Sequence, residues 1–144
     1  MIAIDTNILI YAHRKKTKEH EAAKRAIELA VQDARGWGIS LPSIVEFMSI
    51  VTHPTASGRP SSVQEAREFL SVLQEQAAMQ IWSPQEGFLS RLTQLAIDLD
   101  VNGVRFFDLQ IALVAFENGA TEIWSHDRNF LKLPGLKVRD PLGR

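Results

Sequence analysis

The chain alternates short apolar runs with longer segments of helical periodicity, and no other feature of the sequence constrains the fold as strongly. The apolar runs are short enough to be strands and lie at residues 1–5, 37–41, 79–83, 121–125 and 136–140. The helical segments lie at residues 6–13, 18–34, 42–53, 62–76, 86–100 and 108–119. Strands that alternate with helices are typical of α/β proteins with a mostly parallel sheet, and we expect that fold class here.

Local signals support several of the expected helices. Segment 18–34 predicts an amphipathic helix whose apolar stripe is formed by four residues, Ala22, Ala26, Leu29 and Ala30. Ser62 followed by Glu65 has the spacing of a capping box at the start of a helix. Gly119 predicts the end of the helix that begins near residue 108.

Length, charge and cysteine content exclude several classes of protein. A chain of 144 residues with no internal repeat or linker is expected to form one domain, residues 1–144. The absence of cysteine excludes a disulfide framework and fits a cytoplasmic location. Asp5 interrupts the first apolar run, so we expect no secretory signal, and no apolar stretch is long enough to span a bilayer. A formal net charge of −1 argues against a generally basic nucleic-acid binder, so nucleic-acid contact would need a local patch or a metal ion.

Four acidic residues fall where expected strands end or the following helices begin. Asp5 ends the first strand, Glu46 lies in the first turns of segment 42–53, Asp108 begins segment 108–119, and Asp127 follows the strand at 121–125. Ligands of open parallel sheets bind outside the carboxyl ends of the strands. The sequence therefore predicts a shared acidic pocket at that edge of the sheet.

Each of these aspartates has a simpler explanation when it is considered alone. Aspartate is a favoured N-cap worth about 1 kcal/mol, so Asp5, Asp108 and Asp127 could each only cap a helix. As a group they favour a cation site, because two carboxylates ~5 Å apart at an effective dielectric constant of 20 cost about 3 kcal/mol. Oxygen ligands suit Mg²⁺ or Mn²⁺, and a chain with no cysteine and no paired histidines at metal spacing disfavours zinc.

Four motifs in order along the chain resemble those of PIN-domain nucleases, and most of all the VapC-type toxin ribonucleases of toxin–antitoxin pairs. They are IDTNILIYA at 4–12, the helix that contains Glu46, FFDLQIALVAFENGA at 106–120 and IWSHDRNF at 123–130. The resemblance implies a three-layer α/β/α sandwich with a sheet of about five strands. It also implies an endoribonuclease that depends on Mg²⁺ or Mn²⁺, forms a homodimer and is blocked by an antitoxin protein.

The resemblance places catalysis and metal binding on four acids, Asp5, Glu46, Asp108 and Asp127. It makes Asp5 and Asp108 the primary metal ligands, while the other two acids bind through water or orient the attacking water. Asn7 and Ser125 match polar positions of the family, where their side chains would hold the carboxylates. Asn129 stands where the family often has a further acid, which bears on a second metal ion more than on the first.

Two interpretations from other functional classes use the same residues. A receiver-like or phosphatase-like domain would be phosphorylated on Asp5, but phosphatases of that kind need an acid two residues later, where this chain has Asn7. A non-catalytic PIN-like scaffold would bind RNA or protein without cutting it, but such a protein has no reason to keep a repulsive cluster of acids.

Several other residues have simpler explanations. The basic run at 13–18 is expected to be a solvated loop or a contact for RNA phosphates. We expect the three tryptophans to be core or interface residues, and His20 to lie on the surface.

Overall fold

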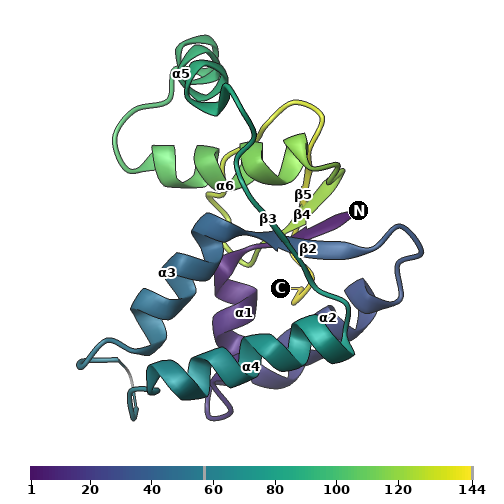
Figure 1. The fold of residues 1–144 in the computed structure, drawn as a ribbon, viewed down its shortest axis with the longest axis vertical. Helices are drawn as coiled ribbons and strands as arrows, with labels where there is room; N and C mark the ends of the chain where they lie inside the picture. The colour runs from purple at the N-terminus through teal and green to yellow at the C-terminus, as the bar shows by residue number, and fades with distance from the viewer. Residues whose placement is uncertain (57, 144) are drawn as a thin grey trace.

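The computed structural model describes residues 1–56 and 58–143 and places five parallel strands in one sheet. The strands are β1 (Ile2–Ile4), β2 (Trp37–Ser40), β3 (Gln80–Trp82), β4 (Glu122–Trp124) and β5 (Lys137–Arg139). Their order across the sheet is β3-β2-β1-β4-β5, and each neighbouring pair is parallel. The predicted α/β class and parallel sheet are therefore confirmed, and β1 lies at the centre (Figure 1).

Within residues 1–56 and 58–143, six helices cover the two faces of the sheet and complete a three-layer sandwich (Figure 1). They are α1 (Thr6–His13), α2 (His20–Val31), α3 (Leu41–Val51), α4 (Val63–Gln76), α5 (Phe88–Leu99) and α6 (Arg105–Glu117). Side chains of α1, α2, α3 and α4 form a core on one face, and side chains of α5 and α6 form a second core on the other. All five strands are short, and β1 is buried along its whole length, as expected for a central parallel strand.

The position of β2 depends on a glycine. A Cβ atom on Gly38 would lie 2.6 Å from the carbonyl oxygen of Gln80 and 2.8 Å from the ring of Trp82. Gly38 pairs with Gln80 in the register of β2 and β3, so a side chain there would push these strands apart. Since Ser40 at the end of β2 leads directly into α3, this packing also fixes the direction in which α3 leaves the sheet.

The structure corrects three details of the sequence analysis. The buried stripe of α2 is formed by Ala23, Ala26, Ile27 and Ala30, whereas Ala22 is half-buried and Leu29 is 52% exposed. His20, which was expected on the surface, is buried, and its Nδ1 lies 2.9 Å from the carbonyl oxygen of Tyr11. Helix α6 begins at Arg105, three residues earlier than expected.

Other expectations about the core and the caps are confirmed. All three tryptophans, Trp37, Trp82 and Trp124, are buried in the core. Ser62 and Glu65 form the predicted capping box of α4, with each side chain bonded to the other residue's backbone N–H.

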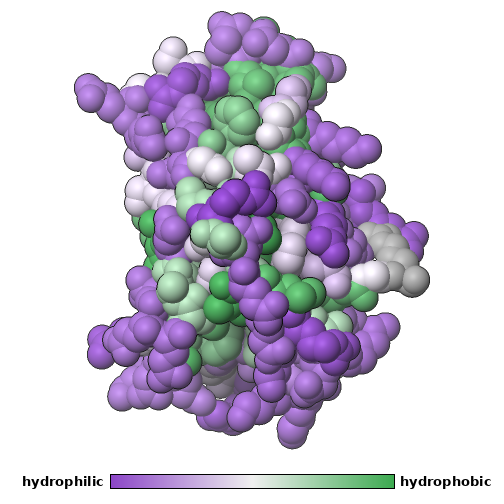
Figure 2. Space-filling view, turned by 90° about the vertical axis from the view of Figure 1, so that its right-hand side faces the viewer, coloured by the Kyte–Doolittle hydropathy of each residue, from purple (hydrophilic) through white to green (hydrophobic). Residues whose placement is uncertain are grey.

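The part of the chain that the structure describes contains no helix long and apolar enough to cross a membrane. One face of the surface is mostly hydrophilic, with hydrophobic residues gathered in its middle part (Figure 2).

Candidate active site

Asp5 is held at the carboxyl end of the central strand and also begins α1. It is the N-cap of α1, and its Oδ1 accepts a hydrogen bond of 2.8 Å from the backbone N–H of Thr6. Its Oδ2 accepts a hydrogen bond of 2.7 Å from the Ser125 hydroxyl, which follows the neighbouring strand β4. Asp5 is only 7% exposed. The cap and the candidate site therefore use the same carboxylate, so the two explanations of Asp5 are compatible.

Asn7 and Ser125 link the ends of β1 and β4 around this carboxylate. The Asn7 side-chain amide lies 3.4 Å from both Asp5 Oδ2 and Ser125 Oγ. Its oxygen accepts a hydrogen bond of 3.2 Å from the backbone N–H of His126. Ser125 Oγ in turn accepts one of 3.1 Å from the backbone N–H of Asp127. The two polar residues named from the sequence thus hold both Asp5 and the loop that carries Asp127.

Asp108 approaches the site from α6. It lies in the first turn of the helix and is half-buried, but the N-cap is Val104, which makes no side-chain cap bond. The suggestion that Asp108 only caps a helix is therefore wrong. Asp127 is exposed, and its Oδ1 accepts a hydrogen bond of 2.9 Å from the Asn129 backbone N–H. This bond closes a local turn and caps no helix.

The electrostatics of the site couple all four acids. Burial, with smaller contributions from the charges of Asp108 and Glu46, raises the pKa of Asp5 to about 6, although hydrogen bonds from Ser125 and Thr6 lower it. Burial also raises the pKa of Asp108, with a further rise from Asp127 and a smaller one from the half-buried Glu46. The backbone N–H of Leu131 and the charge of Arg105 partly offset this rise. The structure thus places the four acids within one electrostatic cluster.

The cluster has the chemistry of a site for a hard divalent cation. Carboxylate, hydroxyl and amide oxygens are the donors that Mg²⁺ and Mn²⁺ prefer, and these ions usually keep several waters. A divalent charge would offset the repulsion that raises the pKa of Asp5 and Asp108. Over residues 1–56 and 58–143, however, no three acidic or histidine side chains are close enough to hold a metal ion directly. The chemical types of these donors therefore fit a hard divalent cation.

Two residues beside the acids were not identified as a pair from the sequence. The ring Nδ1 of His126 lies 3.1 and 3.0 Å from the two carboxylate oxygens of Asp140. His126 follows β4 and Asp140 follows β5, and these strands are parallel neighbours in which Trp124 pairs with Arg139. The pairing register could have revealed the contact, but the sequence does not state that register.

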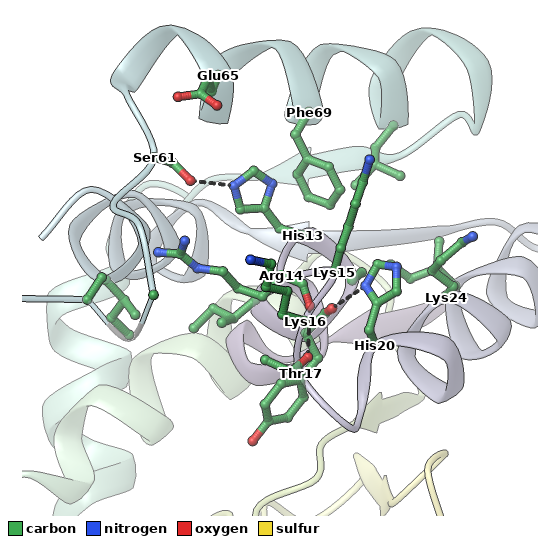
Figure 3. Close-up of a pocket in the computed structure, with 18 of the residues that line it drawn as sticks. His13, Arg14, Lys15, Lys16, Thr17, His20, Lys24, Ser61, Glu65 and Phe69 are labelled. Atoms are coloured by element: carbon green, nitrogen blue, oxygen red, sulfur yellow. Dashed lines mark hydrogen bonds between the residues drawn. The ribbon is translucent and has the colours of Figure 1, made fainter.

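A groove of about 1030 Å³ opens on the helical layer formed by α1, α2 and α4 (Figure 3). Its floor is largely apolar, and five of its lining residues are cationic: Arg14, Lys15, Lys16, Lys24 and Arg59. The basic run singled out in the sequence therefore lines a groove. None of the four acids is among the described lining residues, but α1 runs from Asp5 to His13 in the groove, a distance of about 12 Å for eight residues.

Two residues at the end of α1 fix one wall of this groove. Arg14 donates hydrogen bonds of 2.6 Å to the carbonyl oxygen of Arg59 and 2.9 Å to that of Val51. His13 Nε2 lies 2.8 Å from the Ser61 hydroxyl, as drawn in Figure 3. Burial and the charge of Arg14 lower the pKa of His13, which Glu65 partly offsets. These contacts tie the segment before α4 to the end of α1 at the groove.

Comparison with known proteins identifies close similarities along nearly the whole chain. Residues 2–136 match the profile of the PIN domain. The chain is 32% identical to VapC ribonuclease Mb2897 of Mycobacterium bovis over 142 residues, covering 99% of this chain and 96% of that protein. It is 26% identical to ribonuclease VapC48 of Mycobacterium tuberculosis over 137 residues, covering 95% and 94%.

Solved structures share the fold at lower sequence identity. VapBC2 of Rickettsia felis, solved with a DNA fragment from its promoter, matches with a TM-score of 0.68 at 19% identity, covering 97% of this chain and 98% of that one. VapC20 of M. tuberculosis, a toxin that cleaves the sarcin-ricin loop, matches with a TM-score of 0.65 at 14% identity, covering 90% and 92%. At these identities the likeness establishes the three-layer fold.

Proposed function

The chain belongs to the PIN-domain family and, within it, to the VapC ribonucleases, and from this premise we propose that it is a metal-dependent endoribonuclease, the toxin of a toxin–antitoxin pair. The observation that carries the proposal is the state of Asp5. A buried carboxylate fixed by Ser125 and Asn7, with its pKa raised by burial and by other acids, is costly unless a cation occupies the site. We propose that residues 1–144 form one nuclease domain.

Each acid has a distinct role in this proposal. Asp5 and Asp108 bind the metal, because both are withdrawn from solvent and their charges repel. Glu46 and Asp127 bind through water or orient the attacking water. Asn7 and Ser125 hold the Asp5 carboxylate in one orientation before substrate arrives. A bound Mg²⁺ or Mn²⁺ supplies an activated water and stabilises charge on the phosphate oxygens.

The groove of α1, α2 and α4 supports an antitoxin partner. Its apolar floor and cationic rim complement an amphipathic segment that carries acidic side chains along one edge. VapBC2 of R. felis, which shares the fold, was solved bound to a DNA fragment from its promoter. We propose that such a segment of the antitoxin docks in this groove. An occupant there would lie beside the end of α1, about 12 Å from Asp5 at the start of that helix.

The face between α3 and α6 supports the proposed homodimer. A hollow of about 300 Å³ there is lined in part by Val45, Glu46 and Phe107. Val45 is 61% exposed and Phe107 is 63% exposed, so two large apolar side chains at this hollow are open to a partner. Covering them would also bring a second copy to the edge of the acid cluster at Glu46. We further propose a cytoplasmic location, which the absence of cysteine fits.

Cleavage of RNA with and without a chelator tests the proposed function. Purified protein should cut ribosomal RNA with Mn²⁺ or Mg²⁺ present and should stop when EDTA is added. Asp5→Asn and Asp108→Asn should each abolish cutting while circular dichroism shows a retained fold. Asp98→Asn is the matched control, because Asp98 is an exposed acid on α5 bonded only to Gln94 among the described residues. Full activity of either site variant would refute the assignment, and binding of RNA without cutting would favour the scaffold interpretation.

A further inference from the structure

The ring of His126 is fixed beside the candidate active site by contacts on several sides. His126 stands between Ser125, which bonds to Asp5, and Asp127. Its backbone N–H donates to the Asn7 side chain at 3.2 Å. Its ring Nδ1 contacts both oxygens of Asp140, and the ring of Tyr11 lies edge-on at 6.1 Å between centroids. None of the roles assigned above to the acids uses this side chain.

The contact with Asp140 fixes which ring nitrogen of His126 carries the hydrogen. An ionised carboxylate only accepts hydrogen bonds, so Nδ1 of the neutral ring must be the donor. The second nitrogen, Nε2, is then left with a lone pair and acts as an acceptor. Asp140 is held in turn by the backbone N–H of Leu142, which donates to its Oδ1 at 3.0 Å. In the neutral form of the ring, the pair therefore presents one oriented acceptor.

This acceptor is open to solvent. In residues 1–56 and 58–143, Nε2 of His126 has no hydrogen-bond partner. It is also absent from the buried side-chain atoms that lack a partner, which in the same residues are Thr6 Oγ1 and Ser43 Oγ. An atom that is neither bonded nor buried must be accessible, in agreement with the 30% exposure of the His126 side chain.

A fixed acceptor next to a phosphodiester site selects for a donor on the substrate. Phosphate oxygens are themselves acceptors, so the lone pair of Nε2 does not bind them. The sugar–phosphate backbone of RNA offers one hydroxyl donor per nucleotide, the 2′-OH, and DNA lacks it. We propose that His126 Nε2 accepts a hydrogen bond from the 2′-OH of a nucleotide beside the scissile bond, with Asp140 as its positioning residue. The proposal rests on the proposed RNA cleavage and assigns the preference for ribose to a named pair.

A purely structural role would use the same Nδ1 contact. The Ser125 N–H donates to the Arg139 carbonyl oxygen at 2.9 Å and already links the segments that follow β4 and β5. In the structural role, the His126–Asp140 pair adds a second link between these segments and does nothing else. A tether of that kind affects stability and overall rate. It does not change how the enzyme distinguishes one sugar from another, and this difference separates the two roles.

Sugar substitution in a short RNA measures that difference. The substrate is an oligonucleotide around the strongest site cut in ribosomal RNA, with single nucleotides changed in turn to 2′-deoxy or 2′-fluoro. Fluorine keeps the ribose-like pucker and an acceptor but removes the donor. The wild-type protein should lose roughly two- to tenfold in kcat/KM at one position with either change, which is the worth of one hydrogen bond. On all-ribose RNA, kcat/KM of His126→Ala should be lower than that of the wild type by the same factor. A 2′-deoxy or 2′-fluoro change at that position should not lower kcat/KM of His126→Ala any further.

Variants and a binding measurement complete the test. Asp140→Asn should reduce the discrimination without abolishing cleavage, and His126→Gln, which keeps an acceptor, should retain part of it. His53→Ala is the control, because it removes an exposed imidazole that contacts only Thr55 among the described residues. Fluorescence anisotropy measures the affinity of the Asp108→Asn protein for each oligonucleotide. The affinity should fall at the same sugar position and by the same factor as kcat/KM does. When His126→Ala is added to Asp108→Asn, the modified and all-ribose oligonucleotides should bind equally.

The outcomes separate this proposal from the proposed function. If the wild-type protein cuts no RNA, the proposed function fails. If it cuts RNA but His126→Ala keeps the full sugar discrimination, His126 is only structural and this inference is wrong. If 2′-fluoro is cut as fast as ribose at every position, Nε2 accepts no hydrogen bond from a 2′-OH, and the inference is overturned in that case too.

Discussion

The burial of Asp5 makes the stability of the metal-free protein depend on pH in a way that one substitution removes. The pKa of this carboxyl rises from its ordinary value of 3.8 to about 6 in the folded protein. At 1.36 kcal/mol per pKa unit this rise corresponds to about 3 kcal/mol. Because the folded state holds the proton more tightly, it binds more protons than the unfolded chain between these two values. Stability from this group is therefore present below about pH 4 and is lost as the pH rises to about 6.

Asp5→Asn isolates this effect because asparagine caps a helix about as well as aspartate. The variant keeps a side-chain oxygen for the Thr6 N–H and removes the charge. In EDTA at pH 7.5, we expect the variant to be more stable than the wild type by about 1–3 kcal/mol, the lower value allowing for weaker bonds to Ser125 and Asn7. At pH 4 the difference should be much smaller, since the carboxyl is then almost fully protonated in the folded wild type and about two-fifths protonated in the unfolded chain.

Urea unfolding at the two pH values, with and without Mn²⁺, measures the effect. Groups present in both proteins contribute equally to the pH dependence of their free energies of unfolding. The difference between the two free energies therefore reports on Asp5 alone. Mn²⁺ at a hundredfold excess over its dissociation constant should stabilise the wild type by about 2.7 kcal/mol and the variant much less. The difference in their free energies of unfolding should therefore become smaller or change sign. Asp98→Asn should show no such pH dependence. A variant whose stability differs from the wild type by the same amount at pH 4 and pH 7.5 would refute the reasoning about burial.

Four further outcomes follow from the same structure. Asp108→Asn should also be more stable than the wild type in EDTA by about 1–3 kcal/mol. If the variant and the wild type have the same melting temperature as each other in EDTA and again in Mn²⁺, the acids do not form a repulsive cluster. Mn²⁺ affinity measured by calorimetry should be weaker at pH 5 than at pH 8, because Asp5 with its pKa of about 6 must lose its proton to bind. Light scattering should report a dimer at micromolar concentration, and Phe107→Asp should make it a monomer. Gly38→Ala should cost roughly 1–3 kcal/mol in urea unfolding, since its Cβ would meet the Gln80 carbonyl at 2.6 Å.

The sequence predicted the order of strands and helices because each element carries its own periodicity and end signals. Its errors lie where those signals are ambiguous. In α2 the alanines at 22 and 23 are chemically alike, so their spacing alone does not decide which of them faces the core, and tertiary packing selects Ala23 and Ile27. Aspartate is a good cap, so the sequence predicts that α6 starts at Asp108, whereas the helix begins at Arg105 after Val104.

The candidate site divides in the same way between local and long-range information. The four acids were predicted because they sit at strand and helix ends, which are local features. The contacts of His20 with Tyr11 and of His126 with Asp140 depend on how separate elements pack. The register of β4 and β5 alone brings residues 126 and 140 together, and a parallel register cannot be read from two three-residue strands.

The double use of Asp5 explains why a helix cap lies at the centre of the acid cluster. Each carboxylate oxygen can accept two hydrogen bonds or one bond and a metal. Over the described residues, Oδ2 receives Ser125 and Asn7, while Oδ1 receives only the Thr6 N–H, so Oδ1 keeps one position open. The cap bonds hold the carboxylate in place before a cation arrives, so binding needs no reorganisation of this side chain. Asp127, which is exposed and fixed only through a local turn, offers no such preorganisation. Loss of the Asp5 charge should therefore weaken metal binding more than loss of the Asp127 charge.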